Sequence, residues 1–250
     1  MKDKVLIELK GLTKRYGRQV AVDNLSLEIR EREIFCFLGP NGAGKTTTIL
    51  MLLGLTEPSS GTLSVCGFNP TREALKVKRF IGYLPENVGF YGELSARENL
   101  RYVARLNGLP PHLSEAKIEE ALHTVELEGE AEKKAHAYSR GMRQRLGIAE
   151  LLIKEPRIVF LDEPTIGLDP DGANRMIEMI KSLKNERKMT ILLSSHNLPQ
   201  VQRMSDRVGI MIKGKLVAVG PIEELAREKM GVGQERHTLE DIYMKYFQEV

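Results

Sequence analysis

EIFCFLGPNGAGKTTTILMLLGL, residues 33–55, is the stretch of this 250-residue chain that decides the fold. Residues 33–39 form a continuous apolar run that is typical of a buried strand, and residues 45–55 carry the apolar spacing of a helix. Gly39 to Thr46 lie between them and match G-x-x-x-x-G-K-[ST], in the strand-to-helix context that this motif requires. Because a strand that feeds a helix is half of a βαβ unit, we expect a parallel sheet.

The phosphate-loop motif predicts a nucleotide site. Small residues let successive backbone N–H groups turn toward phosphate oxygens, and the N-terminus of the following helix adds a favourable potential. Lys45 would reach the β- and γ-phosphates, and the hydroxyl of Thr46 would ligate Mg²⁺. Further contacts are expected from Gly39, Asn41, Gly42, Gly44 and Thr47. The chain should therefore bind ATP or GTP.

A second motif, IVFLDE at 158–163, ends an apolar strand in two carboxylates, where α/β sheets usually build their sites. Asp162 would hold Mg²⁺ through water. Glu163 would act as general base, or orient the water that attacks the γ-phosphate. The alternative is a pair of carboxylates that only caps the strand, and the phosphate loop upstream favours the catalytic interpretation.

Strand and helix patterns surround these motifs on both sides. The expected elements are strands over 5–12, 20–29 and 62–67, helices between 95 and 153, and alternating strands and helices over 157–220. Asp169 before Pro170 is a good helix start, with a capping side chain and proline at the first helical position. The residues after 220 have a charged, helical pattern. We expect one α/β core with a β-rich flank and an inserted helical lobe.

Composition fits a soluble globular protein, with 42% hydrophobic and 28% charged residues. A net charge of +3 is too small to indicate nucleic acid or lipid as a partner. No apolar run approaches the ~20 residues of a membrane span, and the N-terminus lacks a signal peptide. Cys36 and Cys66 have no metal-binding spacing, so we expect reduced thiols in the core of a cytosolic protein.

Taken together, these motifs resemble the ATP-binding subunit of an ABC transporter over nearly the whole chain. After the phosphate loop, this family has a glutamine loop, a signature of the LSGGQ type, a D-loop and a switch histidine. The matching segments here are YLPEN (83–87), YSRGM (138–142), GLD (167–169) and SSHN (194–197). Tyr16, in TKRYG, matches the aromatic residue that stacks on adenine.

The resemblance implies a P-loop NTPase (RecA-like) core with a parallel sheet, an N-terminal antiparallel β subdomain and an inserted α-helical subdomain. We expect a single domain over 1–250 with the catalytic core and β subdomain in 1–90 and 154–220, the helical subdomain in 91–153 and a C-terminal helical extension in 221–250. The chain end leaves no room for the regulatory domain that some importer subunits carry, which favours export.

The resemblance also implies a mechanism that needs two subunits, facing head to tail around two ATP molecules. Ser139 and Gly141 would contact the γ-phosphate that the partner chain binds, and Asp169 would link the two sites. His196 would hold the γ-phosphate and the attacking water, beside Glu163 and Lys45 as catalytic residues. The cofactors would be ATP and Mg²⁺. The second subunit would be a copy of this chain or a related one, and both would attach to a membrane permease on the inner face of the membrane.

Some residues depart from the family's pattern. The signature has Tyr138, Arg140 and Met142 where the family has leucine, glycine and glutamine, and the D-loop has Ile166 in place of a serine. Ser139 and Gly141 match the pattern, so the expected phosphate contacts remain. Arg140 would place a cation near the γ-phosphate or point to solvent.

The largest departure is Glu86, which stands where the family has a glutamine. An ionised glutamate only accepts hydrogen bonds, but its oxygen can still ligate Mg²⁺. We therefore expect a greater Mg²⁺ dependence than in a Glu86→Gln variant. A glutamate at this position resembles the ATPases of export systems, so efflux is the expected direction of transport.

Three functions are compatible with the motifs. A membrane exporter predicts a groove near 86–91 for a helix of the permease, with Phe90 and Tyr91 either in that interface or in the core of the lobe. A soluble ATPase acting on nucleic acid or the ribosome would usually have two ATP-binding halves or a basic block, which this chain lacks. A monomeric NTPase or kinase would leave the signature without a purpose. We expect no nucleic-acid partner.

Overall fold

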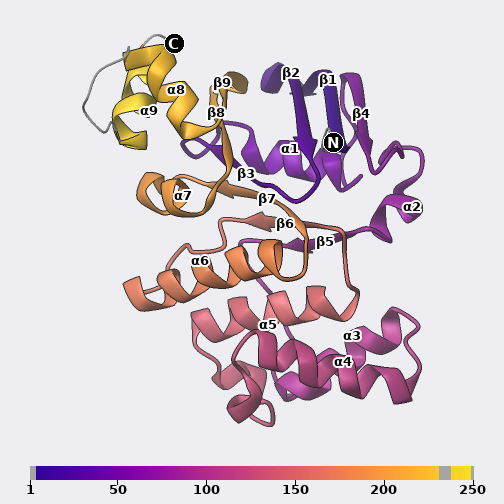
Figure 1. The fold of residues 1–250 in the computed structure, drawn as a ribbon. Helices are drawn as coiled ribbons and strands as arrows, with labels where there is room; N and C mark the ends of the chain where they lie inside the picture. The colour runs from indigo at the N-terminus through magenta and orange to yellow at the C-terminus, as the bar shows by residue number, and fades with distance from the viewer. Residues whose placement is uncertain (1–3, 231–237, 249–250) are drawn as a thin grey trace.

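The computed structural model describes residues 4–230 and 238–248, whose strands form two sheets (Figure 1). The strands of the larger sheet are β3 (Ile34–Leu38), β5 (Ile81–Leu84), β6 (Ile158–Asp162), β7 (Thr190–Ser195), β8 (Arg207–Ile212) and β9 (Lys215–Gly220). They lie in the order β5-β6-β7-β3-β8-β9, and every pair is parallel except β8 with β9. The predicted parallel sheet is confirmed.

A smaller antiparallel sheet covers one side of the larger one (Figure 1). It consists of β1 (Val5–Tyr16), β2 (Gln19–Arg30) and β4 (Ser60–Val65), in the order β2-β1-β4. Along β1 and β2 the buried residues alternate with exposed ones over much of their length, so one face packs on the core while the other faces solvent. These strands are the β-rich flank that the sequence predicts.

Strand β3 joins the two layers of the core because both of its faces are covered. Ile34, Cys36 and Leu38 pack in the cluster formed with the helices, while Phe35 and Phe37 pack in the cluster formed with the small sheet. Successive side chains of a strand point to opposite faces, so a strand buried on both sides must be apolar throughout. This explains the unbroken apolar run that precedes the phosphate loop.

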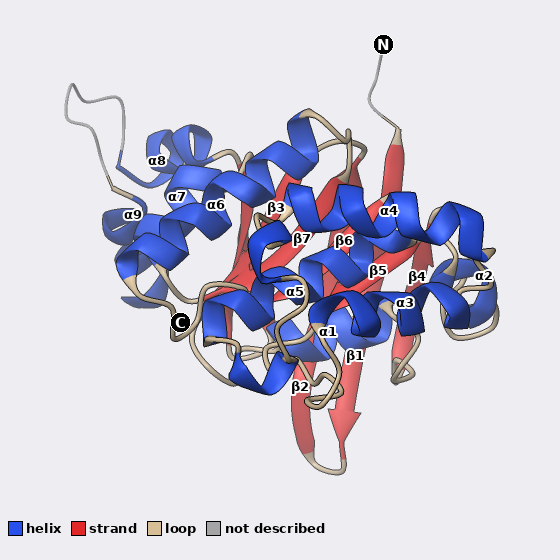
Figure 2. Ribbon diagram, turned by 90° about the horizontal axis from the view of Figure 1, so that it is seen from below, coloured by secondary structure: helices blue, strands red, loops and turns tan. Residues whose placement is uncertain are grey.

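Helices cover the other face of the large sheet. The helices of this layer and of the adjoining lobe are α3 (Ala96–Leu106), α4 (Pro111–Thr124), α5 (Arg140–Ile153), α6 (Pro170–Asn185) and α7 (Leu198–Met204). In Figure 1, α3, α4 and α5 gather at the end of the molecule away from the small sheet, and Figure 2 shows this group in front of the strands. Helix α1 (Lys45–Leu52) instead buries Ile49, Met51 and Leu52 between the two sheets.

The helical lobe begins at a capping box. The Ser95 side chain accepts a hydrogen bond from the Glu98 backbone N–H at 3.2 Å, and the Ser95 N–H donates to the Glu98 carboxylate at 2.7 Å. These bonds satisfy two of the donors that a helix N-terminus leaves free. The expected inserted lobe is therefore present and has a defined first residue.

Two short elements were not predicted. Strand β5 has four residues and α2 (Ala74–Lys78) has five, too few for a hydrophobic period to show in the sequence. One element end also differs from expectation, because α1 ends at Leu52 and not at residue 55. Element ends are the least predictable part of a sequence pattern.

The C-terminal part of the described chain is helical, as expected, with α8 (Ile222–Met230) and α9 (Leu239–Gln248). Within the ranges that the structure describes, no helix has the length and apolar character needed to cross a membrane.

Cys36 and Cys66 are both free thiols; Cys36 is buried and Cys66 is half-buried. Burial raises the pKa of the Cys36 thiol well above its ordinary value, which keeps it protonated and unreactive. Cys66 is thus less deeply placed than the core position expected for it.

Candidate active site

The phosphate loop fits closely against neighbouring backbone. Gly44 has a φ of 101°, and a Cβ there would lie 2.4 Å from the carbonyl oxygen of Ala21. A Cβ at Gly39 would lie 2.2 Å from the carbonyl oxygen of Met211. No other residue type fits at these two positions, since one needs a left-handed backbone and both need close approach. The loop thereby aims backbone N–H groups and the start of α1 at one point.

Lys45 is held at the centre of this loop and is only 5% exposed. Its Nζ donates to the carbonyl oxygens of Gly39 at 2.7 Å and Pro40 at 3.2 Å, and lies 3.5 Å from Glu163 Oε1. A buried ammonium must be surrounded by oxygens to remain charged. Phosphate oxygens can satisfy the same requirement, so this ammonium is suited to bind them.

Asp162 and its neighbours fit a Mg²⁺ site. Asp162 is buried at the end of β6, and its Oδ1 accepts a hydrogen bond from Thr46 Oγ1 at 3.2 Å and another from Ser194 Oγ. Carboxylate and hydroxyl oxygens are ligands that Mg²⁺ prefers. Among the described residues, no three His, Cys, Asp or Glu side chains form a group that could hold a metal. Phosphate and water would therefore have to supply the other ligands.

Glu163 has an unusual backbone and a free oxygen. Its φ is 48°, a left-handed value that its N–H supports by donating to Ser194 O at 3.2 Å and Ser194 Oγ at 3.1 Å. Its Oε2 lies 3.0 Å from His196 Nδ1, whereas Oε1 is buried without a hydrogen-bond partner. The Lys45 ammonium, 3.5 Å away, offsets the charge of Oε1, and because Oε1 accepts no hydrogen bond it can still accept a proton of water.

These residues open into one cavity of about 410 Å³, which we call the nucleotide cavity. It is lined by Tyr16, Gln19, Ala21, Asn41, Gly42, Ala43, Gly44, Lys45, Thr46, Thr47, Glu86 and Glu163. The Tyr16 side chain is 49% exposed, and Lys14 Nζ lies 4.8 Å from the centre of its ring. A half-exposed aromatic ring at the mouth of this cavity can stack on a base. The structure thus brings together most of the residues predicted to bind a nucleotide.

Ser139, Gly141 and Asp169 lie elsewhere, in a cavity of about 330 Å³ that we call the signature cavity. Ser139 Oγ caps α5 by accepting from the Met142 N–H at 3.2 Å, and Asp169 Oδ1 caps α6 by accepting from the Gly172 N–H at 3.0 Å. The remaining lining includes Arg140, Arg145 and Arg175. The start of α5 and three guanidinium groups make this cavity suited to an anion. None of its lining residues lines the nucleotide cavity.

Two residues that hold the site in place, Ser194 and Gln144, were not predicted. Ser194 lies opposite Asp162 in the pairing of β6 with β7, where it bonds both Asp162 and Glu163. The SSHN segment that contains it was the available signal, but only strand pairing shows its partners. Gln144 Nε2 donates to the backbone oxygen of Glu86 at 3.1 Å and so ties that residue to α5. Nothing in the sequence marks this contact.

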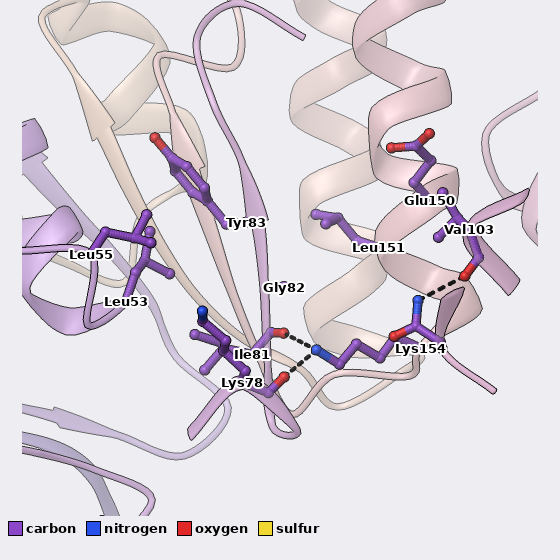
Figure 3. Close-up of a pocket in the computed structure, with 11 residues that line it drawn as sticks. Leu53, Leu55, Lys78, Ile81, Gly82, Tyr83, Val103, Glu150, Leu151 and Lys154 are labelled. Atoms are coloured by element: carbon purple, nitrogen blue, oxygen red, sulfur yellow. Dashed lines mark hydrogen bonds between the residues drawn. The ribbon is translucent and has the colours of Figure 1, made fainter. Parts of the chain in front are cut away.

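A third cavity, about 320 Å³ and largely apolar, separates the sheet from the helical lobe (Figure 3). We call it the groove; it is lined by Leu53, Leu55, Lys78, Ile81, Gly82, Tyr83, Val103, Asn107, Glu150, Leu151 and Lys154. Lys154 donates to the carbonyl oxygens of Lys78 and Ile81, while burial raises the pKa of Glu150 to about 7. Burial also raises the pKa of Tyr83 to about 12.

The groove lies beside 81–83, while a smaller cavity, lined in part by Glu86, Asn87 and Val88, lies at the position expected for the permease helix. The two aromatics expected near it have different surroundings. Phe90 is half-buried and packs against the core, whereas Tyr91 is exposed and donates to the Tyr102 hydroxyl at 3.1 Å. The core interpretation therefore holds for Phe90, and Tyr91 remains on the surface.

Comparison with known proteins gives a consistent result. A family model described as "ABC transporter" matches residues 22–166. The chain is 45% identical over 222 residues to the bacitracin transport ATP-binding protein BcrA of Bacillus licheniformis, over 89% of this chain and 72% of that protein. It is 38% identical over 226 residues to the Nod factor export ATP-binding protein I of Ralstonia nicotianae, over 90% and 70% of the two chains.

A solved structure shows the same fold in a dimer. It is the dimeric post-hydrolysis state of the ATP-binding cassette MJ0796 bound to ADP and Pi, with a TM-score of 0.77 and 25% identity. The match covers 86% of this chain and 98% of that one. The predicted P-loop fold, with its antiparallel flank and helical insertion, agrees with this neighbour.

Proposed function

This chain belongs to the ABC transporter family as an ATP-binding subunit and is an ATPase, and from this premise we propose that two copies enclose two ATP molecules and drive efflux through a separate membrane permease. A partner subunit that is related but not identical would serve in the same way. The chain would then lie on the inner face of the membrane, held there by the permease. The division into a core, a helical subdomain over 91–153 and a C-terminal extension belongs to this proposal.

The observation that carries the proposal is the separation of two cavities. Lys45 and Glu163 line the nucleotide cavity, whereas Ser139, Gly141 and Asp169 line the signature cavity. An anion site that shares no residue with the nucleotide cavity has no role in a single subunit. In a head-to-tail pair, the signature cavity of each subunit would face the ATP bound by the other.

Within one subunit, Lys45 binds the β- and γ-phosphates and Tyr16 stacks on adenine. Mg²⁺ would be held by Thr46 and Asp162, with Glu86 as a further candidate ligand, and would supply positive charge that offsets the charge of the phosphates. Glu163 accepts the proton of the attacking water through its free Oε1. His196 keeps Glu163 in place through their 3.0 Å contact and reaches the γ-phosphate.

Across the pair, the partner supplies the remaining contacts. The backbone and hydroxyl at the start of α5, from Ser139 to Gly141, bind the γ-phosphate with the positive end of the helix. Asp169, which caps α6, connects the signature cavity of its own subunit with the catalytic residues of the other. Hydrolysis therefore requires both subunits, and loss of the γ-phosphate releases them.

We place the permease at the groove. An apolar surface between the sheet and the lobe, bordered by Leu53, Val103 and Leu151, suits an amphipathic helix. Its position next to β5, whose strand leads to Glu86, would connect the permease with the nucleotide cavity. The names of the two relatives, a bacitracin transporter subunit and a Nod factor exporter subunit, support transport, and the second supports efflux.

Dimer formation tests the first part of the proposal. A Glu163→Gln variant should bind ATP without hydrolysing it, and with saturating ATP and Mg²⁺ its mass by light scattering should double. The matched control is Glu163→Gln with Gly141→Asp, which places a negative charge in the signature cavity and should keep the protein monomeric. A Glu163→Gln protein that remains a monomer would favour a single-subunit NTPase instead.

The permease and the direction of transport need a separate test. The tagged chain, purified from detergent-solubilised membranes, should bring a polytopic membrane protein with it, and Leu151→Glu in the groove should abolish this recovery. Leu106→Glu is the control, because Leu106 is 69% exposed and lies outside the groove. Inside-out vesicles with both proteins should accumulate a labelled probe, with bacitracin as first choice, when ATP is added. ATP-driven loss of the probe from preloaded inside-out vesicles would reverse the direction.

A further inference from the structure

Glu86 borders two cavities. Besides the nucleotide cavity, it lines a smaller one of about 220 Å³ together with Asn87, Val88, Arg140, Arg143 and Gln144. We call this the charged cavity. Its lining contains one carboxylate and two guanidinium groups, and the residue that carries the carboxylate also lines the nucleotide cavity.

Helix α5 fixes this arrangement from the other side. Gln144 is 2% exposed and donates from Nε2 to the backbone oxygen of Glu86 at 3.1 Å. Arg140 precedes Gln144 by one helical turn, so both side chains leave the same face of α5. The segment that carries Glu86 is thus attached to the helix that presents the signature.

Of the two arginines, Arg143 is already engaged. Its Nη1 donates to the backbone oxygen of Tyr138 at 2.7 Å. In the described part of the chain, the side chain of Arg140 makes neither a hydrogen bond nor an ion pair, and the carboxylate of Glu86 makes none either. Arg140 is therefore the cation of this cavity that remains available to Glu86.

Arg140 also touches the D-loop. A Cβ built on Gly167 would lie 2.9 Å from both Cζ and Nη1 of Arg140, so the guanidinium rests on this glycine. Gly167 has a φ of 67° and precedes Asp169 by two residues. Arg140 accordingly lines both the charged cavity and the signature cavity.

We propose that Glu86 and Arg140 are paired positioning residues that couple the nucleotide cavity to the signature cavity of the same subunit. Arg140 offsets the charge of Glu86 beside the polyphosphate of ATP, in addition to the Mg²⁺ for which Glu86 is a candidate ligand. When Glu86 turns toward Arg140, the guanidinium moves off Gly167, and the D-loop can shift. Occupancy of one subunit's nucleotide cavity thereby alters the surface that this subunit offers to its partner.

The charge argument predicts the sign of each substitution. Arg140→Gln leaves the carboxylate uncompensated near ATP and weakens binding, because the like charges of Glu86 and the phosphates repel within one cavity. Glu86→Gln removes that repulsion, so the loss of Arg140 no longer affects ATP. In the dimer, Glu86→Gln also leaves the two guanidinium groups of the charged cavity without a carboxylate. This disfavours the conformation in which the signature pairs with the partner subunit.

The test is a double-mutant cycle in the full chain with the Glu163→Gln background. The affinity for a fluorescent ATP analogue should fall about three- to tenfold with Arg140→Gln, and Glu86→Gln with Arg140→Gln should bind within about twofold of Glu86→Gln alone. The control cycle replaces Arg140→Gln by Arg175→Gln, because Arg175 lines the signature cavity but not the charged cavity. The effect of Arg175→Gln on this affinity should be the same whether residue 86 is glutamate or glutamine.

The same variants are compared by the ATP concentration that produces half-maximal dimer, where the Glu86 and Arg140 substitutions should again not multiply. Independent effects in both readouts, or coupling equal to that of Arg175, would overturn the pairing. This inference rests on the proposed dimer only for the second readout. A Glu163→Gln protein that never dimerises would contradict the proposed function, while the coupling would still be scored in the monomer's affinity for ATP.

Discussion

Glu163 and His196 meet at the ends of two neighbouring strands, with Glu163 Oε2 3.0 Å from His196 Nδ1. This contact engages one carboxylate oxygen; the other is buried without a hydrogen-bond partner, 3.5 Å from the Lys45 ammonium, and Glu163 lines the nucleotide cavity. The histidine therefore orients the carboxylate that we propose as the base.

His196→Ala should lower kcat for ATP hydrolysis by about 10²-fold and weaken ATP binding by much less, since the imidazole positions the base and supplies only one of the contacts proposed for the γ-phosphate. Steady-state phosphate release and nucleotide titration measure the two effects. The control is His136→Ala, an exposed histidine whose Nδ1 contacts the Gly92 backbone oxygen in the helical lobe. Equal losses in both variants would show that the Glu163 contact is not the cause.

Ser194→Ala should weaken the Mg²⁺ site. The substitution removes a hydrogen bond to Asp162 and one to the Glu163 backbone, at a cost of about 1–2 kcal/mol of unfolding free energy. It should also raise the Mg²⁺ concentration needed for half-maximal ATPase activity. Ser195→Ala is the matched control, because its hydroxyl accepts from the Asn197 N–H and does not contact Asp162. An unchanged Mg²⁺ requirement in Ser194→Ala would remove Ser194 from this site.

Two glycines of the phosphate loop should respond differently to alanine. Gly44→Ala needs a φ near 101° and puts a Cβ 2.4 Å from Ala21 O, so it should cost about 2 kcal/mol or more and abolish ATP binding. Gly42→Ala has a φ of 79° but meets nothing within 4 Å, so only backbone strain of about 1 kcal/mol is expected. Urea unfolding and ATP titration compare them. Equal costs would show that close approach is not what selects glycine.

Glu150 should make stability depend on pH. Its pKa is raised from 4.5 to about 7 by burial, so the folded state retains a proton that the unfolded state has lost between these values. The stability that this retained proton contributes to the folded state is fully present below pH 4.5 and is lost as the pH rises through 7. Above that pH, Glu150→Gln should be more stable than the native chain by about 1–3 kcal/mol, and the difference should vanish near pH 4.5.

Urea unfolding between pH 4.5 and pH 8 measures this difference, and Glu57→Gln on the exposed surface is the control. A stabilisation by Glu150→Gln that stays constant with pH would indicate a packing effect. If a basic side chain of the permease binds Glu150 in the groove, the complex with the native chain should be more stable than the complex with Glu150→Gln.

The sequence motifs predicted the local structure of residues that lie within a few positions of one another along the chain. The spacing from Gly39 to Thr46 reports a local strand, turn and helix, and the structure places that loop as expected. Glu163 following Asp162 likewise marks a strand end. These predictions succeed because the geometry is determined by neighbouring residues along the chain.

The remaining features depend on contacts between segments that are far apart in the sequence, so local sequence motifs could not predict them. Ser194 reaches Asp162 through the register of β6 with β7, and Gln144 reaches Glu86 across 58 residues. The four residues of β5 carry no period of their own, and the groove beside them was not predicted. Burial of Glu150 is likewise a property of the assembled lobe.

The central claim is that each ATP site is shared by two subunits, and mixing two inactive variants tests it most directly. Lys45→Ala disables the phosphate loop and Gly141→Asp disables the signature, so each protein alone should not hydrolyse ATP. In a mixed dimer, the intact loop of the second faces the intact signature of the first. Equal mixing should therefore restore about a quarter of the native ATPase activity, by random pairing of subunits. Activity that stays at the level of the separate variants, although mixed dimers form, would contradict the shared site.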